Sequence, residues 1–187
     1  KMSKRPVVLV VMDGVGISDS EFGNAVKKAY KPTLDNLWEN SPHTEIKAHG
    51  LAVGLPTDDD MGNSEVGHNA LGCGQIYSQG AKLVNENIET GEIFKTETWS
   101  GLVNNCKDGK MHFLGLLSDG NVHSHINHLK ALIKKAKEDG VKEVRVHALL
   151  DGRDVPETSA LTYVDDIEAY MAELNDDSFH ACIASGG

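Results

Sequence analysis

The sequence of 187 residues has few cysteines, few arginines and no apolar run long enough to cross a membrane. Its three cysteines, Cys73, Cys106 and Cys182, are widely spaced and form no C-x-x-C pair. This pattern argues against a disulfide framework or a zinc ribbon and favours reduced thiols. No signal-peptide pattern is present either. We therefore expect a cytoplasmic protein with no membrane partner.

Positive charge is also scarce, with 18 Lys and Arg against 28 Asp and Glu, for a net charge of −10. Such a chain lacks the basic surface that nucleic acid needs, so we expect no nucleic-acid partner. An acidic chain still binds anions where a metal or a few arginines supply local positive charge. Only Arg5, Arg145 and Arg153 are available. The hydrophobic fraction of 40% is enough for a packed core and argues against disorder.

Apolar runs and helical periodicities alternate along the chain. Buried strands are predicted at residues 6–12, 111–117, 143–150 and 180–184. Helices are predicted at residues 33–40, 65–71, 81–89, 96–107, 126–136 and 161–171. Strands that alternate with helices predict an α/β fold with a mainly parallel sheet flanked by helices.

Three of the predicted strands end in the same dipeptide, with Asp13, Asp119 and Asp151 each followed by glycine. Asp-Gly is an ordinary turn sequence. However, α/β proteins place their sites at the carboxyl ends of parallel strands. Three occurrences in corresponding positions therefore predict a functional edge.

Residues 48–78 form a long irregular stretch rich in glycine, asparagine and aspartate. Such stretches in compact chains are usually functional. We interpret the run of Asp58, Asp59 and Asp60 as a loop and helix-entry feature. A domain boundary is predicted here, with one segment at residues 1–78 and a second at 79–187. The sequence stops just past a predicted strand, which is typical of a chain cut short.

Ser64 lies among small residues in the stretch 61–68, directly before a predicted helix. Serine is a favoured N-cap, and the octapeptide alone favours that interpretation. The alternative is a nucleophile, because small neighbours admit a large group and a helix start attracts anions such as phosphate.

A serine nucleophile needs a base or a metal to remove its proton. His68 lies one helical turn later on the same face, but the G-x-S-x-G elbow of α/β hydrolases is absent. Asp13 is the better partner, because a divalent ion bridging it and Ser64 would activate the hydroxyl and neutralise phosphate charge. A simple turn role for Asp13 remains the alternative.

His123, His125 and His128 follow a predicted strand and open a helix. Their spacing nearly matches the H-x-H-x-D-H ligand set of metallo-β-lactamase-like hydrolases. Asn127 replaces the aspartate, which removes an anionic ligand. Alternatively, one histidine contacts substrate and the others are structural.

Arg153 and Asp154 follow the strand predicted at 143–150. Arginine can hold a phosphate or carboxylate with two parallel hydrogen bonds. Asp154 could act as a base on a substrate hydroxyl. The alternative is a surface ion pair between the two, which would stabilise little.

Taken in order, these motifs resemble the cofactor-independent phosphoglycerate mutases of the alkaline phosphatase superfamily. The matching stretches are 11–14, 23–25, 52–56, 61–68, 115–125 and 150–154. The resemblance implies that a metal-activated serine takes the phosphoryl group of 3-phosphoglycerate and returns it to give 2-phosphoglycerate, a step of glycolysis and gluconeogenesis. No 2,3-bisphosphoglycerate is implied as cofactor.

By this resemblance Ser64 is the nucleophile and, with Asp13, a ligand to one of two Mn²⁺ or Mg²⁺ ions. His123, Arg153 and Asp154 hold the substrate, and Asp154 also handles the hydroxyl proton. The resemblance leaves the roles of His68 and of the histidines at 125 and 128 open.

Members of this family are much longer, with an inserted transferase domain inside a phosphatase domain built from both chain ends. The resemblance implies that residues 1–78 are the first phosphatase segment and 79–187 the early transferase domain. The remaining metal ligands and most substrate arginines would follow residue 187, so this chain alone is expected to be inactive. The complete protein would be a monomer that acts on a small phosphoglycerate.

Three alternatives stay open. One is a related phosphatase or phosphopentomutase of the same superfamily. Another is a non-catalytic fragment, and a metallo-β-lactamase-like hydrolase ranks last.

Overall fold

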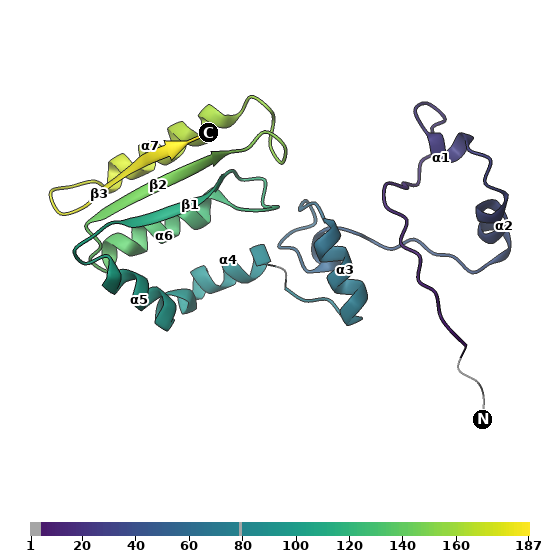
Figure 1. Cartoon of the computed structure of the whole chain (residues 1–187), viewed down its shortest axis with the longest axis horizontal. Coiled ribbons are helices and arrows are strands. Elements are labelled where there is room, and N and C mark those ends of the chain that lie inside the picture. The colour runs from purple at the N-terminus through teal and green to yellow at the C-terminus, as the bar shows by residue number, and fades with distance from the viewer. Residues whose placement is uncertain (1–4, 79) are drawn as a thin grey trace. The chain divides into compact units, whose positions relative to one another are not determined.

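The structure is a computed structural model that describes residues 5–78 and 80–187, and it divides into two compact units (Figure 1). The units meet in sequence between residues 45 and 46. The boundary predicted at Gln79 lies outside the described residues.

The first unit contains the short helix α1 (Ala25–Lys28) and the helix α2 (Pro32–Asn40). The helix predicted at 33–40 is therefore confirmed, and Pro32 suits its first turn because proline needs no hydrogen-bond partner there. The strand predicted at residues 6–12 is wrong. These residues are extended but exposed, from 94% at Val7 to 50% at Met12. A strand exists only through hydrogen bonds to a neighbour, and no strand is described in residues 5–45 to supply them.

The second unit holds the sheet and most of the helices. Its first part comprises the 3₁₀ turn η1 (Gly50–Val53), α3 (Ser64–Cys73), α4 (Gly80–Thr90), the 3₁₀ turn η2 (Glu92–Lys95) and α5 (Glu97–Asn105). Its second part comprises β1 (Met111–Leu117), α6 (Ile126–Glu138), β2 (Glu143–Leu150), α7 (Ala160–Leu174) and β3 (His180–Gly186). These elements confirm the remaining predicted strands and helices. No helix among the described residues has the length and apolar character needed to span a bilayer.

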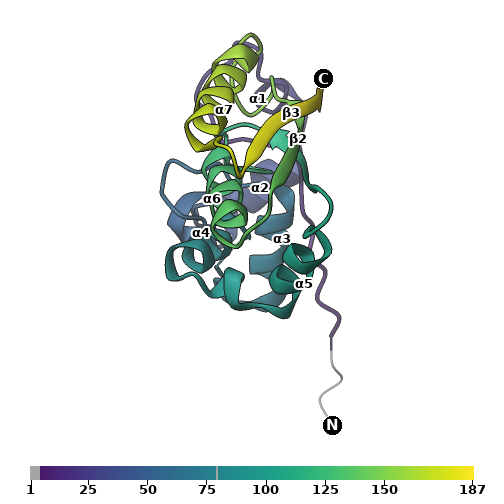
Figure 2. The ribbon, with the colours of Figure 1, turned by 90° about the vertical axis from the view of Figure 1, so that its left-hand side faces the viewer.

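The three strands form one parallel sheet in the order β1-β2-β3. The α/β prediction is thus confirmed for this unit. Helices α6 and α7 lie on the same face of the sheet (Figure 2). The alternating burial of β2 follows from this arrangement, because Val144, Val146 and Ala148 face the helices and are buried. Ile133 of α6 and Ile167 of α7 complete the centre of this core with no exposed surface.

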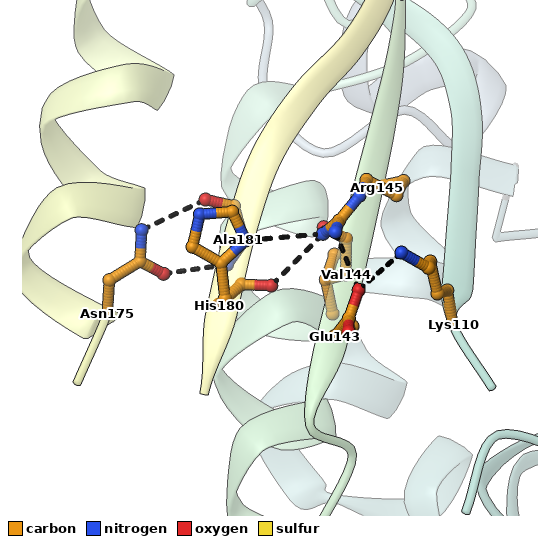
Figure 3. A network of polar contacts seen from close by, with 7 residues as sticks. All are labelled: Lys110, Glu143, Val144, Arg145, Asn175, His180 and Ala181. Carbon is orange, nitrogen blue, oxygen red and sulfur yellow. Dashed lines mark hydrogen bonds and ion pairs between the residues drawn. The ribbon is translucent and has the colours of Figure 1, made fainter. Parts of the chain in front are cut away.

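The intervening residues of β2 lie on the opposite face and include a polar network (Figure 3). Glu143 accepts hydrogen bonds from Lys110 at 2.7 Å and from Arg145 at 2.6 Å. Arg145 also donates to the backbone oxygen of His180 at 3.3 Å. The hydrogen bond from Lys110 lowers the pKa of the Glu143 carboxyl. Arg145, one of the three arginines in the sequence, therefore links β2 to β3.

Candidate active site

The loop before α3 is held in shape by its own backbone and by one carboxylate. The Asp60 side chain accepts hydrogen bonds from the Thr57 N–H at 2.7 Å and from the Thr57 hydroxyl at 2.8 Å. Its backbone oxygen accepts from the Gly50 N–H at 3.1 Å. A Cβ atom at Gly62 would overlap the backbone oxygen of Ala48, so only glycine fits there. The loop therefore presents the start of α3 in a defined position.

The N-cap of α3 is Asn63, and the N-cap interpretation of Ser64 is wrong. The Asn63 side chain accepts the Val66 N–H at 2.9 Å. Asparagine caps at least as well as serine, so the residue one position earlier takes the role. Ser64 becomes the first helical residue, with an exposed side chain. Its hydroxyl therefore does not cap the helix, and its polar contact is with His68 of the next turn.

His68 faces Ser64 from the next turn of α3. Its Nδ1 atom lies 2.7 Å from the Ser64 backbone oxygen and 3.2 Å from the Ser64 hydroxyl. A carbonyl oxygen only accepts, so the shorter contact requires a proton on Nδ1. A protonated Nδ1 cannot take the hydroxyl proton, and this geometry disfavours His68 as the base.

The ends of β1 and β2 lie side by side, because Leu117 pairs with Leu150. Two of the three predicted Asp-Gly turns therefore share one edge. The buried Ser118 hydroxyl donates to Asp151 at 2.6 Å, and Asp151 also accepts the three backbone N–H groups of residues 152–154. Burial raises the pKa of Asp151, but these donors outweigh burial and lower it to about 2. Asp151 thus shapes the turn, a structural role that the sequence did not reveal.

This turn brings three predicted site residues to one edge. A Cβ atom at Gly120 would lie 2.6 Å from the Asp154 Cβ, so the loop after β1 approaches Asp154 closely. The His123 Nε2 lies 3.9 Å from the Asp154 carboxylate. Arg153 is exposed, and its guanidinium has no hydrogen bond or ion pair among residues 5–78 and 80–187. The alternative of an Arg153–Asp154 ion pair is therefore wrong.

A cavity of about 330 Å³ joins this edge to the start of α3. Its wall includes Asn63 and Glu65, which flank Ser64, and Asn121 and His123 from the loop after β1. The structure thus brings the flanks of Ser64 and one predicted substrate residue, His123, around one space, whereas Arg153 and Asp154 are not part of its lining. Asp13 belongs to the first unit, so its pairing with Ser64 stays a prediction.

The histidines after β1 have separate partners. His125 is the N-cap of α6 and accepts the Asn127 N–H at 3.1 Å. His128 contacts the Asn85 side chain on α4 through Nε2. No group of three metal-ligating side chains is found in the described part of the chain. Contacts to a backbone N–H and to an amide side chain favour the structural interpretation of His125 and His128.

Comparison with known proteins decides the family. The family model described as BPG-independent PGAM N-terminus matches residues 84–186, more than half of the chain. The chain belongs to this family. A probable 2,3-bisphosphoglycerate-independent phosphoglycerate mutase of Leptospira interrogans is 51% identical and covers 98% of the chain. The corresponding enzyme of Clostridium novyi is 53% identical over 92% of the chain.

A crystal structure of Leishmania mexicana phosphoglycerate mutase at low cobalt concentration gives the same result for the fold. It matches 95% of the chain with a TM-score of 0.84 and 47% sequence identity. The chain spans about a third of each relative, 34% of the two bacterial proteins and 33% of the Leishmania chain. It therefore corresponds to the N-terminal part of phosphoglycerate mutases of the 2,3-bisphosphoglycerate-independent type.

Proposed function

We propose that this chain supplies the phosphoryl acceptor and part of the substrate site of an enzyme that interconverts 3-phosphoglycerate and 2-phosphoglycerate. The single observation that carries the proposal is the shared cavity, which is lined by both neighbours of Ser64 and by His123. A site for phosphoryl transfer needs a nucleophile and an anion-holding group around one space. The family assignment supplies the reaction class. The alternatives without this reaction, a phosphatase or an inert fragment, gain no such support.

In the proposed reaction the Ser64 oxygen bonds to phosphorus while the bond from phosphorus to the substrate O3 breaks. The proton lost by Ser64 ends on the freed hydroxyl of glycerate. In the second half the glycerate O2 bonds to phosphorus while the bond from phosphorus to the Ser64 oxygen breaks, and the proton lost by O2 ends on the Ser64 hydroxyl. Ser64 is exposed and its hydroxyl does not cap the helix, and both observations support this role.

Arg153 and His123 are proposed to hold the anionic substrate, and Asp154 to move the proton of the attacking hydroxyl. The Arg153 guanidinium has no partner among the residues that the structure describes, which supports the first role, because a doubly charged phosphate can accept two parallel bonds from it. The short distance from His123 to Asp154 supports a joint role around one substrate.

Two divalent ions, Mn²⁺ or Mg²⁺, are proposed as cofactors, with Asp13 and Ser64 as ligands to one of them. Both residues offer oxygen, the ligand atom that these ions prefer. When bound, such an ion lowers the pKa of the hydroxyl and neutralises phosphate charge. The use of cobalt, another divalent ion, with the Leishmania mutase is consistent with a divalent site in the family. We propose a cytoplasmic enzyme, in keeping with the free cysteines.

The test uses a complete mutase that contains this segment. Ser64→Ala is expected to abolish both mutase activity and phosphoserine formation, measured by a coupled assay and by mass spectrometry. Ser100→Ala, at another exposed serine near a helix start, is the matched control and should keep activity. Full activity in Ser64→Ala would remove this serine from the mechanism.

The inert-fragment alternative has its own test. The chain alone should show no turnover, and adding the remaining two thirds of a relative as a separate polypeptide should restore it. Turnover by the chain alone would contradict the proposed division of the site.

A further inference from the structure

The segment that carries Ser64 has an apolar core of its own. Val53, Leu55 and Val66 form a buried cluster that is separate from the core beneath the sheet. We call residues 48–73 the Ser64 segment. Since the two apolar clusters do not merge, apolar packing contributes little to fixing the position of this segment relative to the sheet. Polar contacts must contribute to its placement.

One such contact joins the Ser64 segment to the loop after β1. The Asn121 Nδ2 donates to the Asp60 carboxylate at 2.6 Å, across 61 positions of sequence. Asp60 also accepts both hydrogen bonds from Thr57, so its carboxylate links the internal bracing of the loop to a residue beyond it. Burial raises the pKa of Asp60, but the bonds from Asn121 and Thr57 outweigh burial and lower it. The contact therefore involves the charged carboxylate, which makes it a strong hydrogen bond.

Asn121 is placed for this contact by an unusual backbone. Its φ of +61° is the only left-handed value at a non-glycine residue among the described residues. Asparagine tolerates the left-handed region better than most residues, but glycine adopts this conformation with less strain. The Asn121 Oδ1 is buried and has no hydrogen-bond partner within the described part of the chain. A strained backbone and an unpaired atom are tolerated where the remaining contact matters.

The position of the pair gives it a consequence for the site. Asp60 precedes Ser64 by four residues, and Asn121 precedes His123 by two. Asn121 and His123 both line the cavity that reaches the flanks of Ser64. A bond between these two loops therefore sets the distance between the acceptor hydroxyl and the substrate-holding edge.

We propose that the Asp60–Asn121 hydrogen bond is a latch that positions the Ser64 segment against the substrate loop. Asp60 and Asn121 are positioning residues, which act through Ser64 and His123. The catalytic part of this inference rests on the proposed function. The structural part does not, because it concerns only how one segment is held.

Three variants separate the latch from general stability. Asn121→Gly removes the amide and keeps the backbone, because glycine adopts positive φ without strain. Asn121→Asp keeps the shape and places two carboxylates against each other. The double variant Asp60→Asn with Asn121→Asp exchanges donor and acceptor. It restores one bond, with the new amide oxygen still able to accept from Thr57.

The structural readout is the distance between spin labels on Cys73 of α3 and on a cysteine introduced at the exposed Glu168 of α7. Cys106 and Cys182 are replaced by alanine in every sample. We expect one narrow distance distribution with the latch, a broad one in both single variants, and a narrow one again in the double exchange. Circular dichroism checks that each variant is folded. A distribution that stays narrow in both single variants, or one that stays broad in the double exchange, would overturn the latch.

The catalytic readout uses the same substitutions in a complete mutase. Both single variants should lower kcat about tenfold, equivalent to about 1.4 kcal/mol, while KM changes little, because the substrate groups themselves remain. The double exchange should recover most of the loss. Loss of activity without rescue would refute the positioning role. A complete mutase that lacks activity before any substitution would instead refute the proposed function, and the spin-label result would still decide the latch.

Discussion

The Asp151 turn offers the sharpest test of the forces at the site edge. The perturbation is Asp151→Asn, which keeps the size and shape of the side chain and removes its charge. Asp151 accepts four hydrogen bonds, one from the Ser118 hydroxyl and three from backbone N–H groups. The asparagine oxygen can keep the backbone bonds in weaker form. Its NH₂ group would face Ser118, whose oxygen already accepts the Gly120 N–H at 3.0 Å.

The magnitude follows from the bonds that change. A hydrogen bond to a charged group contributes about 1.5–3 kcal/mol, and the bond that Ser118 donates is the one lost, because an NH₂ group cannot accept it. We therefore expect a loss of about 2 kcal/mol in the free energy of unfolding at pH 7. With a urea m-value of about 2 kcal/mol/M, the midpoint should fall by about 1 M.

The dependence on pH has a definite sign. The pKa of Asp151 is about 2 in the folded protein, below its ordinary value of 3.8. A lowered folded pKa stabilises the protein above the unfolded pKa, and this contribution is lost as pH falls from about 4 towards 2. The difference between wild type and variant should therefore be full at pH 5–7 and shrink below pH 4.

The assay is urea unfolding at several pH values, followed by the fluorescence of Trp99, which is buried in the sheet unit. Ser118→Ala should give a loss at least as large, because it removes the same bond from the other side and also the acceptor of the Gly120 N–H. A difference that is equally large at pH 7 and pH 3, or one close to zero at pH 7, would refute the proposed electrostatic origin.

Two further predictions concern single residues in the second unit. Gly54→Ala should destabilise the loop, because the φ of Gly54 is +87° and a Cβ would overlap a backbone carbonyl. Gly67→Ala should instead stabilise α3 by up to about 1 kcal/mol, because a Cβ there meets open space. Thermal unfolding of the two variants compares their stabilities. Asp119→Asn should lower the pKa of Tyr163 from about 12 towards 10, because the hydrogen bond to Asp119 is the main cause of the rise; ultraviolet titration against Tyr163→Phe measures it.

The sequence was informative wherever a pattern reports burial directly. The strands at 111–117 and 143–150 were predicted with their observed bounds, because a mostly apolar run marks the first and alternating apolar and polar residues mark the start of the second. The same reasoning was wrong for residues 6–12. An apolar run reports the tendency to be buried, but it carries no information on whether a neighbouring strand is present.

Local competition and long-range contacts limited the prediction of the site. Asn63 and Ser64 are both good caps, and the sequence alone does not show which of them begins the helix. The bond between Asp60 and Asn121 spans 61 positions, and neither residue stands out in the sequence. The nearest available signal was an asparagine directly after Asp-Gly, where a left-handed residue is common. The proximity of His123 to Asp154 could be expected, because both follow adjacent strands.

The strand order also has a consequence for how the chain folds. Each strand of the sheet pairs with the next one in sequence, through a single helix. During synthesis every strand therefore finds its partner as soon as one more strand and helix have emerged, and the sheet can grow without waiting for distant segments. The valine-rich residues 6–12 differ, because they are made before the sheet and no strand is described in residues 5–45. An exposed apolar run without a partner strand is a segment that can aggregate while the chain is being made.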